Sequence, residues 1–321
     1  MQHVYTLTSL HLRGAWVTIG VFDGVHRGHQ ALLRDFVAEA HAHAAPAVVV
    51  TFYPHPAEVL SNRRAPFYLT SPEEKARLIA ALGVDVLLTH PFDEEVARQP
   101  AQVFMQALKA HLGLRRLWVG YDFALGRGRE GDIPTLRRLG ETLGYTVHVV
   151  EAYRLDGEVV SSTRVRQALA AGQVRQAARL LGRLYDLPGQ VVPGEGRGRR
   201  LGFPTANLAT WPKRMVPASG VYACYADLAE GTFPAVVNIG VRPTFEQGEA
   251  VPRIEAHLLD FSGDLYGRRL TLRFVARLRA ERRFPSAEAL AAQIARDVAQ
   301  ARTVLAAEPA PRAATPVPSL G

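Results

Sequence analysis

The sequence has a single cysteine, Cys224, among its 321 residues, so no disulfide can form within the chain. It has no apolar run long enough to cross a bilayer, and its first residues lack the basic-then-apolar order of a secretory signal. No segment repeats at a fixed period. These absences argue against a disulfide-rich secreted protein, a membrane-spanning protein and a repeat array, and they predict a cytoplasmic protein.

Lysine is also scarce. Lys75, Lys109 and Lys213 are the only three, and the rest of the 38 basic side chains are arginine. The formal net charge is +8, but the arginines are spread along the chain rather than gathered in one tail. Charge of this kind is weak evidence for nucleic-acid binding, and a protein that handles phosphorylated ligands would also be basic. We therefore expect no nucleic-acid partner and no membrane partner.

The first half of the sequence alternates strand-like and helix-like segments. The strand-like segments are 15–22, 47–52, 84–89, 116–119 and 146–150, and the helix-like segments are 29–44, 71–83, 100–112 and 133–143. This alternation predicts an α/β fold, with a parallel sheet covered by helices on both faces. Such sheets bind ligands beyond the carboxyl ends of their strands, where segments 20–29, 54–56 and 120–123 would converge.

The second half has a different character. Segment 162–181 is helical with a break near Gly172, and after Gly182 short strand-like runs alternate with turns. These runs, at 220–226, 235–241, 253–261 and 269–278, predict an antiparallel β-barrel. Ser286 then caps an amphipathic helix that ends near Ala307. We expect two domains, 1–183 and 184–307, that meet near residues 182–186, and a disordered Pro/Ala-rich tail at 308–321.

The segment Gly20-Val-Phe-Asp-Gly-Val-His-Arg-Gly-His29 is the strongest functional signal. It follows a predicted strand and opens a helix, so His26 and His29 lie where backbone N–H groups favour anions. Gly24 and Gly28 let the backbone approach a nucleotide closely. Two imidazoles here would stabilise charge on a phosphate during nucleotidyl transfer, whose anionic nucleophile needs no strong base. A metal site and a structural role are the alternatives, and no cysteine or carboxylate cluster supports the metal.

A candidate partner of the histidine pair is Ser161-Ser-Thr-Arg-Val-Arg166. The hydroxyls of Ser162 and Thr163 at a helix start, followed one turn later by arginine, would form a pocket for the β- and γ-phosphates. The alternative is an ordinary serine cap with solvated arginines.

A second glycine-rich stretch, Gly196-Arg-Gly-Arg-Arg-Leu-Gly-Phe-Pro-Thr-Ala-Asn207, lacks the ending of a Walker loop. Thr205 and Asn207 offer neutral oxygens that an extended segment would point to one side. Such oxygens suit Mg²⁺ carrying nucleotide phosphates, and a simple turn after Pro204 is the alternative.

Glu255 is a candidate general base, since transfer of phosphate to an alcohol benefits from a positioned carboxylate. It lies in an apolar strand-like run, where a period of two places it with His257 and Leu259. The alternative is an acid that faces solvent.

The first half resembles the FAD synthetase (FMN adenylyltransferase) module of prokaryotic bifunctional riboflavin kinase/FAD synthetases, which belong to the HxGH nucleotidyltransferases and have a Rossmann-like fold. Besides the 20–29 segment, the matching motifs are Thr51-Phe-Tyr-Pro-His-Pro56, Val119-Gly-Tyr-Asp-Phe123, Gly126-Arg-Gly-Arg-Glu-Gly-Asp132 and Val160-Ser-Ser-Thr-Arg-Val-Arg166. One departure is Leu125, where relatives usually carry an aromatic residue.

The resemblance implies roles for these residues. It gives adenylate binding to Phe22, Asp23, Gly24 and Gly28, phosphate stabilisation to His26 and His29, and triphosphate contacts to Ser162, Thr163 and Arg166. It gives the flavin side and the adenylate pocket to Pro54, His55, Pro56, Asn62, Asp122 and Phe123.

The second half is similar to the riboflavin kinase module, a small β-barrel with a C-terminal helix. The matching motifs are Gly198-Arg-Arg-Leu-Gly-Phe-Pro-Thr-Ala-Asn-Leu208, Gly220-Val-Tyr222, Asn238-Ile-Gly-Val-Arg-Pro-Thr244, Glu255-Ala-His-Leu-Leu-Asp-Phe-Ser-Gly-Asp-Leu-Tyr-Gly267 and Leu278-Arg-Ala-Glu-Arg-Arg-Phe284. The resemblance makes Glu255 the base toward the 5′-hydroxyl of riboflavin and gives ATP contacts to Gly198, Arg200, Gly202, Thr205 and Asn207, the last two also as Mg²⁺ ligands.

The sequence therefore predicts a two-step enzyme that uses ATP and Mg²⁺ to convert riboflavin to FMN and FMN to FAD. A rival is another HxGH enzyme, such as a class I tRNA synthetase fragment, but the Lys-Met-Ser-Lys-Ser-like loop of those enzymes is missing. A second rival is a flavin- or RNA-binding regulator with inactive sites, which the intact His26, His29 and Glu255 disfavour. The sequence leaves the oligomeric state open.

Overall fold

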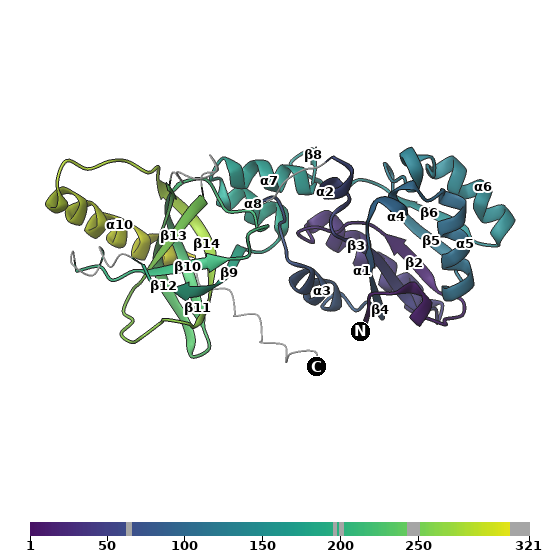
Figure 1. Cartoon of the computed structure of the whole chain (residues 1–321), viewed down its shortest axis with the longest axis horizontal. Coiled ribbons are helices and arrows are strands. Elements are labelled where there is room, and N and C mark those ends of the chain that lie inside the picture. The colour runs from purple at the N-terminus through teal and green to yellow at the C-terminus, as the bar shows by residue number, and fades with distance from the viewer. Residues whose placement is uncertain (62–65, 195–197, 199–201, 243–250, 309–321) are drawn as a thin grey trace. The chain divides into compact units, whose positions relative to one another are not determined.

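A computed structural model of the chain describes residues 1–61, 66–194, 198, 202–242 and 251–308. Asn62, Arg200 and the tail 309–321 lie outside these residues, so the expectations for them stay predictions. The chain divides into two units, Met1–Ser162 and Thr163–Gly321, whose elements are labelled in Figure 1.

The first unit is built on a six-stranded sheet. Its strands are β1 (Gln2–Val4), β2 (Trp16–Ile19), β3 (Ala47–Tyr53), β4 (Val86–Pro91), β5 (Arg116–Gly120) and β6 (Thr146–Val150). They lie in the order β1-β4-β3-β2-β5-β6, and every pairing is parallel, which confirms the predicted sheet. The chain leaves β2 toward β3 on one side and leaves β5 toward β6 on the other. The connections thus diverge between β2 and β5, where open sheets of this kind bind ligands.

Helices cover both faces of this sheet, as predicted. They are α1 (Arg27–Ala42), α2 (Pro56–Leu60), α3 (Pro72–Ala80), α4 (Glu94–Arg98), α5 (Ala101–Leu112) and α6 (Ile133–Leu143). Residues of α1 and α3 pack in one apolar cluster with Val49 and Trp118, and residues of α5 and α6 pack in another with Val48 and Val50. Successive strand residues face opposite sides of the sheet, so the continuous apolar runs of β2 and β3 contribute side chains to both clusters.

Local sequence signals set several helix ends. Ser71 and Glu74 form the predicted capping box at the start of α3. Gly113 and Gly144 end α5 and α6 in the left-handed conformation. Elements with too few residues for a periodic pattern were missed. These are β1, α2, α4, the hairpin β7 (Arg154–Leu155) and β8 (Glu158–Val159), and the 3₁₀ turns Leu7–Ser9 and Arg127–Arg129.

The second unit contains the predicted antiparallel barrel. Its strands are β9 (Tyr185–Val192), β10 (Ala206–Thr210), β11 (Gly220–Leu228), β12 (Gly231–Arg242), β13 (Val251–Leu258) and β14 (Arg269–Arg279). They close in the order β10-β13-β12-β11-β14-β9. The rings of Tyr185, Tyr222 and Phe274 are fully buried, and the Phe274 ring contacts both tyrosine rings. The sequence expectations included β11 to β14 but omitted β9 and β10. Pro188 and Gly189 interrupt the run of β9, and β10 has only five residues.

Helices precede and follow the barrel strands in the sequence. The break predicted at Gly172 separates α7 (Ser162–Ala170) from α8 (Val174–Leu181), and α8 packs against β9 and β14. Ser286 caps α10 (Ala287–Ala307) as expected, and this helix packs against β11, β12 and β14. The buried carboxylate of Asp297 on α10 accepts two bonds from the Arg279 guanidinium, at 2.8 and 3.0 Å, which joins the helix to β14.

The two glycines that end α5 and α6 offer a matched stability test. Both have a positive φ, but a Cβ at Gly113 would lie 2.8 Å from the backbone N of Gly14, whereas a Cβ at Gly144 would meet only Lys109 Nζ, at 3.6 Å. We expect Gly144→Ala to cost about 1–2 kcal/mol, the usual penalty of a left-handed residue. Gly113→Ala should cost clearly more, because backbone must also move. Urea unfolding of the full chain, with a signal from the first unit, measures the free energy of unfolding of both variants. Equal losses would contradict the clash.

Candidate active sites

The turn between β2 and α1 carries the histidine motif in an unusual backbone conformation. Phe22, Gly24 and Val25 have φ values of 51°, 78° and 40°. The carboxylate of Asp23, which is 3% exposed, accepts bonds from the backbone N–H groups of Leu69 at 3.0 Å and Thr70 at 3.2 Å. Asp23, expected to contact the adenylate, therefore anchors the turn to a distant loop.

The neighbouring backbone completes this anchor. Gly24 N–H donates to the hydroxyl of Thr70 at 3.1 Å, and the hydroxyl of Ser162 donates to the carbonyl of Asp23 at 2.8 Å. The two predicted phosphate segments, 20–29 and 161–162, thus lie together in the first unit. Thr163 and Arg166 belong to the first turns of α7 in the second unit, so their approach to the phosphates stays a prediction.

His26 and His29 lie side by side at the start of α1. His26 caps the helix, with its Nδ1 accepting the backbone N–H of His29 at 3.3 Å, and the two rings stack with centroids 3.6 Å apart. A Cβ at Gly28 would press on the His26 ring at 3.2 Å. This contact explains glycine between the two histidines.

The His29 ring carries a polar atom that the described residues around it do not satisfy. Its Nδ1 is buried and has no hydrogen-bond partner within the part of the chain that the structure describes. Burial lowers the pKa of His29 well below the usual 6.5, and the charges of His26 and Lys75 lower it further. A neutral imidazole still carries one N–H, which can donate to a phosphate oxygen.

A cavity of about 790 Å³, called here the histidine cavity, opens beside these rings at the carboxyl ends of β2, β5 and β6. This is the point where the connections diverge. Its lining includes seven of the predicted residues: Phe22, His26, Gly28, His29, Asp122, Phe123 and Ser162. Its volume falls within the roughly 300–1,000 Å³ of small-molecule sites.

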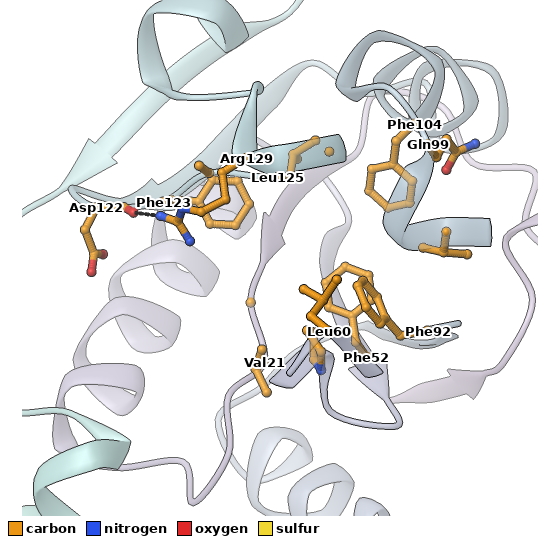
Figure 2. A pocket seen from close by; sticks show the side chains of 15 residues that line it. Val21, Phe52, Leu60, Phe92, Gln99, Phe104, Asp122, Phe123, Leu125 and Arg129 are labelled. Carbon is orange, nitrogen blue, oxygen red and sulfur yellow. Dashed lines mark hydrogen bonds between the residues drawn. The ribbon is translucent and has the colours of Figure 1, made fainter. Parts of the chain in front are cut away.

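A second cavity of about 410 Å³, called here the aromatic cavity, lies at the same edge of the sheet. Figure 2 shows the rings of Phe52, Phe92, Phe104 and Phe123 arranged around it, with Leu60 and Leu125. Arg129 lines it too and donates to the carbonyl of Asp122 at 3.0 Å, the bond drawn dashed in Figure 2. Apolar walls with a few polar groups suit a flat aromatic ligand.

The two cavities share part of their walls. Gly20, Asp122 and Phe123 line both. A ligand in one would therefore adjoin a ligand in the other beside the turn that bears the histidines.

The predicted flavin residues have different positions. Pro56 lines the aromatic cavity, whereas Pro54 and His55 do not. His55 caps α2, since its Nδ1 accepts the backbone N–H of Ala57 at 3.0 Å, and the backbone N–H of His55 donates to the hydroxyl of Tyr68 at 2.7 Å.

Sequence reasoning missed Lys75 on α3. Its side chain is buried, and its ammonium donates to the hydroxyl of Thr51 at 2.9 Å and to the carbonyls of Val21 at 3.1 Å and Phe52 at 3.3 Å. The available signal was a lysine in the periodic pattern of a helix that packs on a buried sheet.

In the barrel, the candidate base and one candidate metal ligand are neighbours. Asn207 on β10 is in register with Glu255 on β13, and directly opposed residues of antiparallel strands share a face. Glu255 forms an ion pair with Arg253 at 2.8 Å, and Arg253 Nε donates to Asn207 Oδ1 at 3.4 Å. Arg253 was not singled out from the sequence, although it lies two residues from Glu255 on the same strand.

A cavity of about 570 Å³, called here the barrel cavity, lies beside this group. Thr205 lines it together with Val191, Ala206, Ala256 and the segment 261–266, but Asn207 and Glu255 do not. The structure therefore places Thr205 in this cavity and Asn207 beside Glu255.

The described glycines of the loop before β10 occupy different settings. A Cβ at Gly198 would clash with the carbonyl of Phe203, whose N–H donates to Gly198 O at 2.9 Å, so the loop closes tightly there. Gly202 has a φ of +82° and open space around it.

Across residues 1–61, 66–194, 198, 202–242 and 251–308, no three His, Cys, Asp or Glu side chains gather as a metal site. Neutral oxygens of Thr205 and Asn207 with nucleotide phosphates and water are a donor set that Mg²⁺ accepts. Within the same residues, no helix has the length and apolar character to cross a bilayer.

Two family models match the chain in succession. One, described as FAD synthetase, matches residues 8–164, and the other, described as riboflavin kinase, matches residues 181–305. The chain is 44% identical over 295 residues to a bifunctional riboflavin kinase/FMN adenylyltransferase of Pseudomonas fluorescens, covering 92% of this chain and 94% of that protein. It is 41% identical over 304 residues to the protein of the same name from Escherichia coli K12, covering 94% and 96%.

A solved structure has the same fold. A crystal structure from Streptococcus pneumoniae, titled a macrolide-efflux protein, matches with a TM-score of 0.85 and 29% identity, covering 94% of this chain and 98% of that chain.

The lowered pKa of His29 predicts a pH dependence of stability. The unfolded imidazole takes up a proton near pH 6.5, while the folded one takes it up only at lower pH. The unfolded state then binds more protons, so the free energy of unfolding should decrease as the pH falls below 6.5. His29→Gln should remove that part of the decrease. Urea unfolding at pH 7.5, 6.5 and 5.5 measures the difference, and a His29 NMR resonance that titrates at 6.5 or above would contradict it.

Proposed function

The chain belongs to the family of bifunctional riboflavin kinase/FMN adenylyltransferases, and from this premise we propose how its residues carry out the two reactions. It is a transferase that phosphorylates riboflavin with ATP to FMN, and then adenylylates FMN with ATP to FAD and pyrophosphate. The observation that best supports our assignment of the second reaction is the shared wall of the histidine and aromatic cavities.

For adenylylation, ATP occupies the histidine cavity and the flavin ring of FMN occupies the aromatic cavity. Their common wall at Gly20, Asp122 and Phe123 brings the FMN phosphate to the α-phosphate of ATP. An oxygen of the FMN phosphate forms a bond to the α-phosphorus, the bond from that phosphorus to the bridging oxygen breaks, and pyrophosphate leaves. The nucleophile is already an anion, so positioning and charge stabilisation dominate the catalysis.

His26 and His29 stabilise the charge that gathers on the α-phosphate. They lie at the N-terminus of α1, whose dipole adds to the effect. The unpartnered Nδ1 of His29 supports this assignment, because a buried polar atom without a partner is costly unless a ligand satisfies it. Ser162, Thr163 and Arg166 are proposed to hold the β- and γ-phosphates. Phe22 and the glycines Gly24 and Gly28 are proposed to border the adenylate, with Asp23 holding their turn.

Pro54, His55, Pro56 and Asn62 keep their proposed place on the flavin side. The support for Pro56 is direct contact with the aromatic cavity. His55 acts by shaping the segment around it. Leu125 contributes apolar surface where the family usually has an aromatic ring, and the neighbouring phenylalanines supply the stacking faces.

For the kinase step, Glu255 takes the proton from the 5′-hydroxyl of riboflavin. The alkoxide oxygen forms a bond to the γ-phosphorus of ATP, and ADP leaves with the electron pair of the broken bond. Asn207 and Thr205 are proposed to hold Mg²⁺, which neutralises phosphate charge when bound. Gly198, Arg200 and Gly202 are proposed to cover the nucleotide. The register of Asn207 with Glu255 supports a common site.

The expected domain limits, 1–183 for adenylylation, 184–307 for the kinase and 308–321 for a tail, stay proposals. The two family models leave residues 165–180 between them, and the division into units lies at Ser162. A cytoplasmic location is supported by the use of ATP in both steps. We propose only small-molecule substrates and no nucleic-acid partner.

Two substitutions separate the reactions. His29→Ala should lower FAD formation from FMN at least 100-fold, the typical loss when a group that stabilises transition-state charge is removed, and should spare FMN formation. Glu255→Ala should lower FMN formation by about 10²–10⁴ and spare FAD formation from added FMN. The activity that each variant retains shows that its chain still folds. Loss of both activities in either variant would contradict independent sites.

The metal assignment predicts a selective change in Mg²⁺ dependence. Chelation should stop both reactions. Asn207→Ala should raise the Mg²⁺ concentration for half-maximal kinase activity at least tenfold, since even outer ligand partners contribute about 10–100-fold to metal affinity. The Mg²⁺ dependence of adenylylation in the same protein is the control. An unchanged kinase dependence would remove Asn207 from the metal site.

A further inference from the structure

Lys75 joins two strand ends that carry the adenylylation site. The pairing of β2 with β3 ends at Gly20, whose N–H donates to Val50 O at 3.0 Å. Beyond that point the ammonium of Lys75 bonds to Val21 O, to the Thr51 hydroxyl and to Phe52 O. The Thr51 hydroxyl also donates to Val21 O at 2.9 Å. These bonds continue the connection between the strands where the backbone ladder stops.

The joined segments form the walls of both cavities. Val21 and Phe52 line the aromatic cavity, and Phe22, which directly follows Val21, and His26, at the end of the same turn, line the histidine cavity. Lys75 lines neither of them. It can therefore act on the reaction through the residues it holds, and its charge also lowers the pKa of His29.

The charge of Lys75 carries a desolvation cost in this buried position. Burial lowers its pKa to about 8, and the nearby Asp23 carboxylate opposes the shift. An apolar side chain would avoid the desolvation cost, so a stabilising role alone does not account for an ammonium here. The titratable groups around it on the neighbouring elements are Asp23, His29, His3, Tyr53, His55 and Tyr68.

We propose that Lys75 is a positioning residue of the adenylylation site: its ammonium fixes the β2–α1 turn to the end of β3 and so sets the distance between the two substrates. The proposal rests on the assignment of adenylylation to this edge of the sheet. Small misplacement of reacting groups can cost about 100-fold in rate, so a group that never touches substrate can control turnover.

The first test compares Lys75→Met with Lys109→Met in the full chain. Lys109 is a matched control, because its ammonium also donates to two carbonyls, Leu114 O at 3.0 Å and Gly144 O at 2.9 Å, but lines neither cavity. Lys75→Met should lower kcat for FAD formation at least tenfold with a smaller change in KM for ATP, and should leave FMN formation unchanged. Lys109→Met should leave both reactions unchanged.

The second test measures the pH dependence of FAD formation. A purely structural role of Lys75 would leave this dependence unchanged. Wild-type FAD formation should decline above about pH 8 as Lys75 loses its proton. Lys75→Arg should extend activity to higher pH, because a guanidinium stays charged. Thr51→Val removes an acceptor that favours the charged amine, so its decline should begin at lower pH. This variant keeps the test decisive if arginine does not fit.

The outcomes separate the two proposals. If the wild-type chain makes no FAD from FMN and ATP, the assigned function fails. If it does, wild-type turnover in Lys75→Met, or an alkaline decline that stays near pH 8 in both Lys75→Arg and Thr51→Val, overturns the role of Lys75.

Discussion

The turn between β2 and α1 is the constraint on which the first site depends. It holds Phe22 and Val25 at positive φ, which costs about 1–3 kcal/mol for each residue that is not glycine. The Asp23 carboxylate, bonded to two backbone N–H groups of the segment that precedes α3, offsets this strain. The same turn delivers His26 as a helix cap and stacks His29 against it. Geometry that unfavourable persists only where the surroundings enforce it, and here it places two imidazoles in the wall of the histidine cavity.

The two units solve different chemical problems with different groups. In our proposal, the phosphate nucleophile of adenylylation arrives already charged, so the parallel sheet needs to supply only a helix N-terminus, imidazoles and a shared cavity wall. The ribityl hydroxyl must lose a proton, and the proposed base is Glu255, which lies in register with Asn207 in the barrel. The ion pair between Arg253 and Glu255 keeps that carboxylate oriented on its strand. Both units handle ATP, and neither uses a Walker loop.

Buried charge in the first unit is concentrated around the site. Asp23 and Lys75 are both nearly inaccessible, and each bonds to backbone groups rather than forming a direct ion pair with the other. Charged side chains that bond to the backbone in this way fix loops that lack the regular hydrogen bonds of a sheet. The aromatic cavity, by contrast, is shaped by rings from β3, the segment after β4, α5 and the segment after β5, which pack without directional bonds (Figure 2).

Much of this was accessible from the sequence. Strand and helix alternation, the caps at Ser71 and Ser286 and the stops at Gly113 and Gly144 are local signals, and local steric and hydrogen-bonding preferences suffice to interpret them. The histidine motif likewise predicts a chemistry from ten contiguous residues. Short elements such as α2 and β1 were not predicted, because a helix of fewer than two turns or a strand of fewer than four residues shows no periodic pattern.

What the sequence by itself determined is the class of fold, the order of the two units and the motifs of the family, because each of these is written in contiguous segments. Only the tertiary structure decided that the Asp23 carboxylate bonds to a distant loop, that His55 caps a helix, that Lys75 bonds to two strand ends and that Arg253 pairs with Glu255. These roles arise from contacts such as Asp23 to Leu69, 46 residues apart, and Lys75 to Val21, 54 residues apart. Pairings at that separation are selected by how whole elements pack, and no local pattern encodes them.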